Sequence, residues 1–453
     1  MAKKIASEPG KKIKTVNGGY VFLIMLLVFF VVLALGMLFQ YLVNKNIGSL
    51  DKTFGIEGKV QLDINSSIDK VSGIVEQKDG KIIVIGTYSV SSNTAENVDI
   101  LLARFNAAGS LDVEFGENGI KIIDLGGMDM GIAVNLQANE KIVTANRSCK
   151  SENNNCEAVL IRLNQDGTID KTFGDAGKQI LEIGDLFYNA PHRLLVGPTD
   201  NIVLAGSWWN GQDFDFAVYL ADKDGSPYTE NGVNGLITVG FGDGKLDIAT
   251  DLTFQGNKIV VVGRTCDSTS EDSCKIGLIR FTSDGKIDRS FGNNGIKTTK
   301  LNTSIIPQAI AEKKNGNFLV VGGRENRFSI FTVVQYKRNG SIDDKFSSKG
   351  KLTDSFIKDR DSWVDDIISQ PDGKFVLMGI SATNEETTNI VLRRYESDGT
   401  LDITFGRNGN LFIDFGRFDF ASAILVTADG KFVIAGNSGD GEQTDIALSR
   451  ILP

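Results

Sequence analysis

A phrase of eleven residues recurs along the chain from residue 48 onward and constrains the fold more than any other feature. Most copies begin and end with Gly and carry an Asp and a Phe between them. The copies are GSLDKTFGIEG (48–58), GSLDVEFGENG (109–119), GTIDKTFGDAG (167–177), GSPYTENGVNG (225–235), GKIDRSFGNNG (285–295), GSIDDKFSSKG (340–350) and GTLDITFGRNG (399–409). They contain 20 of the 50 glycines, so the high glycine content is periodic. The 406 residues from 48 to 453 divide into seven units of 58, which leaves no room for another domain among them.

Each unit holds four strand-like runs. In the first unit they are GKVQLDI, VSGIVEQ, KIIVIGTYS and DILLARFN, which are rich in Val, Ile, Leu and Phe and bounded by turn residues. The lack of a 3.6-residue apolar period excludes helical and leucine-rich repeats, and a β-solenoid would need shorter coils. Four strands in each of seven units therefore predict an all-β, seven-bladed β-propeller of four-stranded blades.

Small residues identify the innermost strand of each blade. The second run of the units carries them, as in Val71-Ser72-Gly73-Ile74 and Ala421-Ser422-Ala423-Ile424, and small side chains fit a crowded axis. The run after each repeated phrase then becomes the outer strand of the preceding blade. We therefore expect residues 59–63 to form the outer strand of the last blade, which closes the ring and covers an exposed edge.

This strand order separates the loops between two faces of the ring. The connections from the first to the second strand and from the third to the outer strand share one face and are regular in most units. The connections from the second to the third strand, and from each outer strand to the next inner strand, share the other face, which we call the variable face. Variable loops on a rigid scaffold are typical of binding surfaces.

The first 47 residues differ from the repeats. Residues 20–43 are almost entirely apolar, and a helix of these 24 residues would span about 36 Å, enough to cross a bilayer core of about 30 Å. Five Lys precede this segment, whereas only Lys45 follows it closely, so residues 1–19 are predicted to be cytoplasmic. The prediction is a signal anchor with a linker at 44–47 and an extracytoplasmic propeller at 48–453, whose variable face points away from the membrane. A cleaved signal peptide, with Ala34-Leu35-Gly36 as the cleavage site, is the alternative.

Four cysteines form two pairs that are close in sequence. Cys149 and Cys156 flank one polar stretch, and Cys266 and Cys274 flank another, each between strand-like runs. This spacing favours a disulfide across a loop that joins two strands, which agrees with export from the cytoplasm. Zinc binding is the competing interpretation, but CxxC spacing is absent and no His lies nearby.

Charge and histidine content narrow the functions open to the exported part. Residues 1–47 hold six of the 48 basic and one of the 57 acidic residues, so residues 48–453 carry 42 and 56, a net charge of −14. Nucleic acid and anionic lipid surfaces are poor partners for such a domain. The single His excludes multi-histidine metal centres. We expect no cofactor, with calcium as the one ion that the carboxylates described below could bind.

The repeated phrase occurs together with a second motif, Gln-x-Asp-Gly-Lys, at residues 77–81 and 370–374, and a strand ending in Ala-Gly or Ile-Gly follows it. Because of these motifs, the sequence resembles the delta-60 repeat family, and the resemblance extends over all of residues 48–453. The resemblance implies a tandem-repeat bacterial propeller that is secreted or displayed at the cell surface, in a family without a common catalytic residue set. Departures are local: the fourth unit has Tyr228 and Asn231 in place of Asp and Phe, and the sixth has Ser347 in place of Gly.

Acidic residues recur in two places. In five units an Arg lies just before the repeated phrase. We therefore expect the Asp of the phrase to form a structural hydrogen bond or ion pair and not to bind calcium. A second set lies at the start of the inner strands and would surround the axial opening: Asp69, Asp129, Asp247, Asp361 and Asp419. These carboxylates could bind calcium or supply two acids for hydrolysis of a sugar. The simpler interpretation is that each binds loose backbone N–H groups and remains solvated.

The third unit departs most from the pattern. Tyr188, His192 and Arg193 precede its inner strand, and Trp208 and Trp209 lie in a second-to-third connection, so all five are predicted on the variable face. Exposed aromatic residues beside Asn, Asp and Arg suit contact with a glycan or a protein. The alternative is that the Trp side chains pack over a neighbouring blade, and one His is weak support for catalysis.

Two functions follow from these features. The first is a non-enzymatic binding or scaffolding module, in which a single-pass membrane protein displays the propeller outside the cell and binds a protein or glycan through the variable face. The second is an extracellular polysaccharide hydrolase or lyase that uses two carboxylates at the axial opening. An enzyme needs acids that face each other at a suitable separation, whereas a binding module needs only a broad surface.

Overall fold

The computed structural model describes residues 28, 29, 31, 32, 47–65, 67–89, 98–151, 154–181, 193–230, 232–242, 245–267, 273–301, 305–324, 327–358, 360–382, 387–440 and 443–453. The chain divides into two units, residues 1–47 and residues 48–453. Among the described residues, no helix is both long and apolar enough to span a bilayer. Most of the predicted anchor, residues 20–43, lies outside the described residues, as do Tyr188 and His192.

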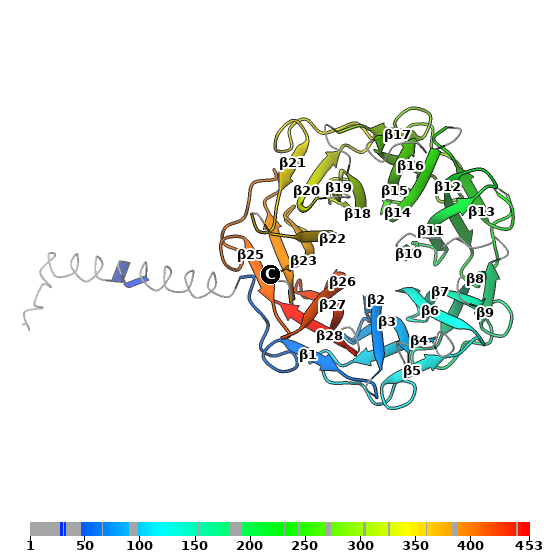
Figure 1. Cartoon of the computed structure of the whole chain (residues 1–453), viewed down its shortest axis with the longest axis horizontal. Helices are drawn as coiled ribbons and strands as arrows, with labels where there is room; N and C mark the ends of the chain where they lie inside the picture. Colours follow the sequence, from blue (N-terminus) through cyan, green and yellow to red (C-terminus); the bar gives the residue numbers. More distant parts are fainter. Residues whose placement is uncertain are drawn as a thin grey trace, which may run out of the picture. The chain divides into compact units, whose positions relative to one another are not determined.

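The described part of residues 48–453 is all-β, because short apolar runs alternate with glycine-rich turns as the sequence predicts. Figure 1 shows its strands arranged in sets around a ring. Within each set, an inner, a second, a third and an outer strand pair antiparallel to one another. This arrangement of strand sets confirms a β-propeller.

The inner strands surround the centre of the ring (Figure 1). They are β2 (Ile68–Glu76), β6 (Met128–Leu136), β10 (Arg193–Val196), β14 (Lys245–Gln255), β18 (Ile306–Glu312), β22 (Ser362–Ser369) and β26 (Phe418–Val426). The second strands are β3 (Ile82–Ser89), β7 (Ile142–Ser151), β11 (Ile202–Trp209), β15 (Lys258–Asp267), β19 (Phe318–Arg324), β23 (Phe375–Ala382) and β27 (Phe432–Gly439).

The third and outer strands complete the sets. The third strands are β4 (Val98–Phe105), β8 (Asn154–Leu163), β12 (Phe214–Ala221), β16 (Lys275–Phe281), β20 (Arg327–Tyr336), β24 (Thr388–Tyr395) and β28 (Thr444–Ile451). The outer strands, each of four residues, are β5 (Ile120–Ile123), β9 (Lys178–Leu181), β13 (Leu236–Val239), β17 (Ile296–Thr299), β21 (Lys351–Asp354), β25 (Asn410–Ile413) and β1 (Lys59–Leu62).

The first strand of the ring completes the last set. β1 pairs antiparallel with β28, with Lys59 opposite Ser449 and Leu62 opposite Ile446. The Gly48 N–H also donates to the Leu452 carbonyl at 2.9 Å. The two ends of residues 48–453 therefore lie side by side, and the edge of β28 is covered.

The Asp of the repeated phrase forms the same contacts in unit after unit. In the second unit, Asp112 accepts a hydrogen bond from Arg104 Nε at 2.7 Å, and the Arg104 guanidinium lies 4.7 Å from the centre of the Phe115 ring. The matching Arg–Asp ion pairs are Arg162–Asp170, Arg280–Asp288, Arg394–Asp402 and Arg450–Asp51. Burial would raise the pKa of Asp402, but hydrogen bonds from Lys374 and Thr404 and the Arg394 charge lower it to about 2. This geometry agrees with the structural interpretation of the phrase.

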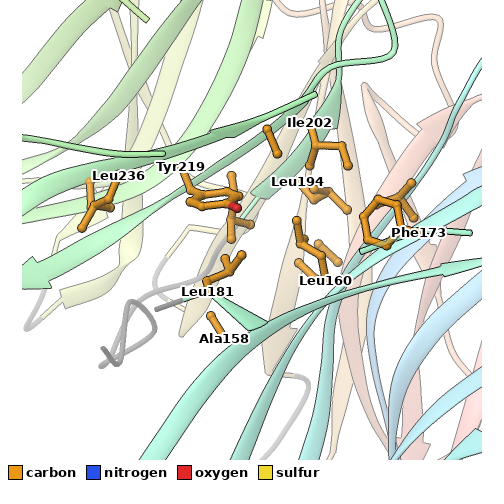
Figure 2. Packing of buried hydrophobic residues seen from close by; sticks show 14 residues of the cluster. Ala158, Leu160, Phe173, Leu181, Leu194, Ile202, Tyr219 and Leu236 are labelled. Carbon is orange, nitrogen blue, oxygen red and sulfur yellow. The ribbon is translucent and has the colours of Figure 1, made fainter. Parts of the chain in front are cut away.

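Apolar side chains fill the space between neighbouring sheets. Figure 2 shows one such core, in which Leu160 of β8 packs with Leu194 of β10, Ile202 of β11 and Tyr219 of β12. Phe173 of the repeated phrase and Leu181 of β9 belong to the same cluster. Each blade therefore buries one face of its sheet against the next blade, which is how small four-stranded sheets acquire a core.

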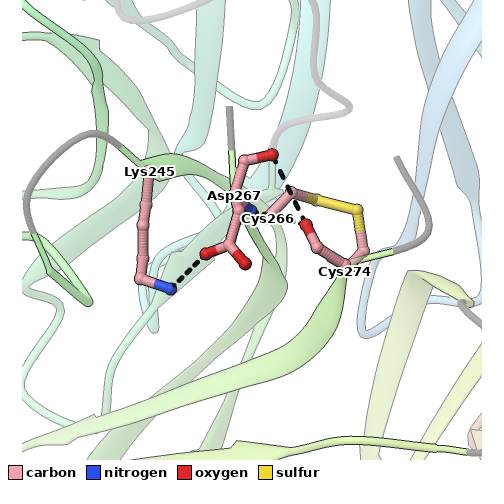
Figure 3. Close-up of a disulfide and its surroundings, with 5 residues drawn as sticks. Lys245, Cys266, Asp267 and Cys274 are labelled. Atoms are coloured by element: carbon pink, nitrogen blue, oxygen red, sulfur yellow. Dashed lines mark hydrogen bonds and ion pairs between the residues drawn. A yellow bond between two sulfur atoms is a disulfide. The ribbon is translucent and has the colours of Figure 1, made fainter. Parts of the chain in front are cut away.

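Both predicted disulfides are confirmed. Cys149 pairs with Cys156 between β7 and β8, and Cys266 pairs with Cys274 between β15 and β16. Figure 3 shows the second bridge, beside which Lys245 Nζ lies 2.8 Å from an Asp267 carboxylate oxygen. Both bridges join a second strand to a third strand, which is where the sequence predicts them. No cysteine remains free for a metal among the described residues.

Substitution of a buried Phe of the repeated phrase should destabilise the ring strongly. Phe115→Ala should lower the free energy of unfolding by about 3–5 kcal/mol, because it removes a large buried ring and leaves a cavity. Phe115 is fully buried. Val113→Ala is the matched control, because this side chain of the same phrase is 66% exposed. Urea unfolding followed by tryptophan fluorescence measures both variants, and equal effects would contradict the assignment of Phe115 to the core.

Candidate functional site

One position of the inner strands distinguishes three blades from the rest. In every blade it pairs with the equivalent residue of the second strand. Four of the described inner strands have small residues there, namely Gly73, Ala133, Ala309 and Ala423. The other three have charged residues, namely Arg193, Asp251 and Asp366. Charged side chains therefore take the place of small ones on β10, β14 and β22.

The three charged residues form an ion-pair cluster. Arg193 Nε lies 3.1 Å from Asp251 Oδ1, and Arg193 Nη1 lies 3.7 Å from Asp366 Oδ2. β10 and β22 lie on opposite sides of the ring in Figure 1, so the Arg193 side chain reaches across the centre. Both Asp side chains are almost fully buried. We call Arg193, Asp251 and Asp366 the axial cluster.

Backbone N–H groups fix the two acids of the axial cluster. Asp251 accepts from its neighbour Leu252 at 2.7 Å and from Ile310, on the inner strand of the next blade, at 2.9 Å. Asp366 accepts in the same way from Ile367 at 2.8 Å and from the N–H of Ile424, also in the next blade. Each Asp therefore joins two inner strands, and its orientation toward Arg193 follows from these bonds.

Burial shifts the titration of this region. It raises the pKa of Asp251 to about 6, although the Arg193 charge opposes the shift. Asp365, the extra residue of the bulge in β22, has a pKa raised to about 7 by burial and by the neighbouring Asp366 charge. Its Oδ2 atom is buried without a hydrogen-bond partner among the described residues. The carboxylates in turn hold the pKa of Arg193 above its usual value. A fixed cation therefore lies beside acids whose pKa values are raised by burial.

Four of the predicted strand-start acids are buried and bonded to their own loops. Ser67 Oγ donates to Asp69 at 2.6 Å. The N–H groups of Leu125, Phe241 and Phe415 donate to Asp129, Asp247 and Asp419 at 2.5, 2.7 and 2.7 Å, respectively. Burial raises the pKa of Asp69 to about 7 and that of Asp247 to about 6. The expected backbone contacts are present, but these side chains are not solvated as the simpler interpretation assumed. Asp361 is exposed and precedes β22.

The two Trp residues of the third unit have different environments. Trp208 packs against the core of Figure 2 and is partly buried, as the structural alternative proposed. Trp209 is 51% exposed, and its ring centre lies 5.0 Å from that of Phe214. The turn between β11 and β12 is held by Asn210, whose Oδ1 accepts from the Gln212 N–H at 2.8 Å. This turn therefore presents an aromatic surface beside polar groups on the variable face.

Arg193 lies elsewhere than expected. The sequence placed it on the variable face, whereas its pairing with Ala205 places it within the inner strand, in the axial cluster. Asp251, Asp365 and Asp366 were not among the site residues predicted from the sequence. A signal was present, since acids interrupt the small and apolar residues of the inner runs in Ala249-Thr250-Asp251 and Val364-Asp365-Asp366.

Comparison with protein families gives a match to a β-propeller family of unassigned function. Residues 77–115, 141–173 and 370–405 match the family described as a domain of unknown function (DUF5122) beta-propeller. The matched segments contain both recurring motifs, the Gln-x-Asp-Gly-Lys turn and the start of the repeated phrase, or parts of them. No curated protein matches the sequence.

Solved structures share the fold at low sequence identity. The polysaccharide lyase Uly1 is 11% identical, with a TM-score of 0.51, and the match covers 89% of this chain and 99% of the lyase. A catalytically inactive virginiamycin B lyase from Staphylococcus aureus is 12% identical over 86% of this chain and 98% of that one, with a TM-score of 0.47. Drosophila Plexin A in complex with Semaphorin 1b is 7% identical over 89% and 88%, with a TM-score of 0.48. At such identities the likeness concerns the fold alone.

Replacement of Asp365 should change how stability depends on pH. An Asp with a pKa near 7 in the folded protein and about 4 in the unfolded chain keeps its proton longer when folded, so stability falls as pH rises between these values. Asp365→Asn removes this loss. The melting temperature of the variant should therefore exceed that of the wild type at pH 8, and the difference should disappear near pH 4.

The exposed Asp361 provides the control for this measurement. For Asp361→Asn, the change in melting temperature between pH 4 and pH 8 should equal that of the wild type, because this side chain is exposed. Differential scanning calorimetry across the pH range measures all three proteins. A constant offset between Asp365→Asn and the wild type at every pH would show that Asp365 does not titrate as described.

Proposed function

We propose that this chain is a membrane-anchored, extracytoplasmic binding module of the delta-60 repeat type. In this proposal residues 1–19 are cytoplasmic, residues 20–43 cross the membrane, and residues 48–453 form a seven-bladed propeller. The variable face binds a protein or a glycan. The two disulfides support an oxidising compartment, where such bridges persist.

The blade count rests on the strand sets and their closure. Six of the repeated phrases lie between a third strand and the outer strand that pairs with it, and the first phrase precedes β1, the outer strand that pairs with β28. Seven phrases therefore correspond to seven blades. The delta-60 assignment rests on the same phrase and on the Gln-x-Asp-Gly-Lys turn, which also occur in the segments matched by the β-propeller family.

The exposed Trp209 carries the binding proposal. It is the one Trp more than half exposed among the described residues, and it lies beside the Asn210 turn with Asp213 and Asp215 close by. Flat aromatic rings next to hydrogen-bonding side chains stack on sugar rings and also form hot spots of protein interfaces. Four of the strand-start acids, by contrast, are buried, which favours a binding surface over a pair of catalytic acids.

A glycan array probed with the full chain in detergent tests this proposal. Trp209→Ala should weaken binding of the glycans recognised by the wild type by about tenfold or more, since interface hot spots contribute 2 kcal/mol or more. Ile180→Ala is the control, because Ile180 is similarly exposed but lies on the outer strand β9. Equal binding by both variants would exclude Trp209 from the binding surface, and no binding of any glycan would direct the search to protein partners.

A polysaccharide hydrolase or lyase remains the second candidate function. The observation that favours it is Asp365, whose raised pKa of about 7 suits a general acid or base at neutral pH. The similar fold of Uly1, described as a polysaccharide lyase, is compatible with this chemistry. Against it, both acids of the axial cluster are paired with Arg193 and with backbone N–H groups.

Activity assays on acidic and neutral polysaccharides separate the two functions. If the chain is an enzyme, Asp365→Asn should lower the rate of product formation by about a hundredfold or more, the usual contribution of a general acid or base. Asp361→Asn should leave the rate unchanged. The binding module predicts no product from any substrate, and product formation that survives in Asp365→Asn would remove Asp365 from the mechanism.

A further inference from the structure

Three carboxylates converge where one blade meets the next. Asp99 lies at the start of β4, Asp124 directly follows β5, and Asp129 lies at the start of β6. One carboxylate oxygen of each lies within 4.8 Å of those of the other two. This is the only group of three or more possible metal ligands among the described residues. The three residues come from separate segments of two neighbouring blades.

The hydrogen bonds of this group leave much of its charge uncompensated. The Leu125 N–H donates to Asp129 Oδ2 at 2.5 Å, and the Gly126 N–H donates to Asp124 Oδ1 at 2.6 Å. Asp129 is fully buried, and its Oδ1 atom has no hydrogen-bond partner in the described part of the chain. A buried carboxylate oxygen without a donor is unfavourable unless a cation compensates it. Burial and the charges of Asp124 and Asp129 accordingly raise the pKa of Asp99.

The corresponding acids at one other junction of the ring have side-chain donors. At the junction of β28, β1 and β2, the equivalent acids are Asp445, Asp63 and Asp69. There Gln61 Nε2 donates to Asp445 at 2.6 Å and Ser67 Oγ donates to Asp69 at 2.6 Å.

The group around Asp99 lacks these donors. The residue that corresponds to Gln61 is Ile122, which cannot donate a side-chain hydrogen bond. No side-chain hydrogen bond or ion pair joins Asp99, Asp124 or Asp129 to another described residue. These three acids therefore differ from their counterparts at that junction by the lack of the two side-chain donors.

We propose that Asp99, Asp124 and Asp129 bind a calcium ion that joins two neighbouring blades. Carboxylate oxygens are the ligands that calcium prefers, at about 2.3–2.6 Å, so two oxygens on opposite sides of one ion lie about 4.8 Å apart. The observed separations fall within this limit. Magnesium requires shorter bonds and a stricter octahedron, so opposite oxygens would lie about 4.1 Å apart. Water and loop carbonyls complete the coordination of calcium.

A bound ion has a mechanical consequence for this part of the ring. It connects the third strand β4, the turn after the outer strand β5 and the next inner strand β6. β4 and β6 are joined directly by a single parallel pair, Val98 opposite Met128. Calcium therefore stabilises a junction that has few backbone hydrogen bonds of its own, and binding raises the melting temperature because the unfolded chain lacks the site.

Isothermal titration of CaCl₂ into the full chain in detergent, after treatment with EDTA, tests the proposal. The wild type should bind one ion per chain with a dissociation constant of about 1 mM or tighter, and its melting temperature should rise with calcium. Asp99→Asn and Asp124→Asn should each weaken binding by about tenfold or more, since affinity depends on the number of charged ligands. Circular dichroism should show both variants folded without calcium.

Asp63→Asn is the matched control, because Asp63 occupies the place of Asp124 at another junction. It should retain the affinity and the melting shift of the wild type. Failure of the wild type to bind calcium at millimolar concentration would overturn the proposal. So would loss of binding in Asp63→Asn with full binding in Asp124→Asn. Equal affinity for MgCl₂ would overturn the assignment to calcium.

Discussion

The contact between an Arg and the Asp of the repeated phrase is the interaction on which the rest of the ring depends. The Arg162 guanidinium binds Asp170 of the repeated phrase, lies over the Phe173 ring and donates to the carbonyl of Lys223, which follows β12 of the next blade, at 2.7 Å. One side chain thus fixes the turn, covers the core and sets the spacing between blades. Because these contacts lie on the regular face, the loops of the opposite face are free to differ without loss of the scaffold.

Most of the architecture could be predicted from the sequence, because each unit repeats the same local signals. The glycines of the phrase mark the turns, and Cys149 and Cys156 face each other because they flank a single strand connection. Burial of Asp69 and Asp419 could not be predicted, since it depends on loops that fold back over the start of each inner strand. Periodicity identifies strands, but the depth of a side chain depends on how neighbouring segments cover it.

The candidate site was harder to predict than the fold. Arg193 precedes a strand in the sequence, and only its register against β11 moves it from the variable face to the axial cluster. Asp251 and Asp366 lie far from Arg193 in the sequence, and their relation to Arg193 appears when strands of different blades meet. Convergence of Asp99, Asp124 and Asp129 is of the same kind, because no local pattern reports distances between segments. Positions at which one unit differs from the others are therefore where sites built from several blades can be sought.

The pairing of β1 with β28 also has a consequence for the order in which the ring forms. Lys59 and Ser449 are neighbours in space but are separated by most of the domain in sequence. During synthesis, β1 has no partner until β28, Thr444–Ile451, has left the ribosome. Blades in the middle of the chain are complete earlier, since their strands are contiguous. Closure is thus the last and least local step of folding, and a chain that stops early leaves two open edges exposed to other chains.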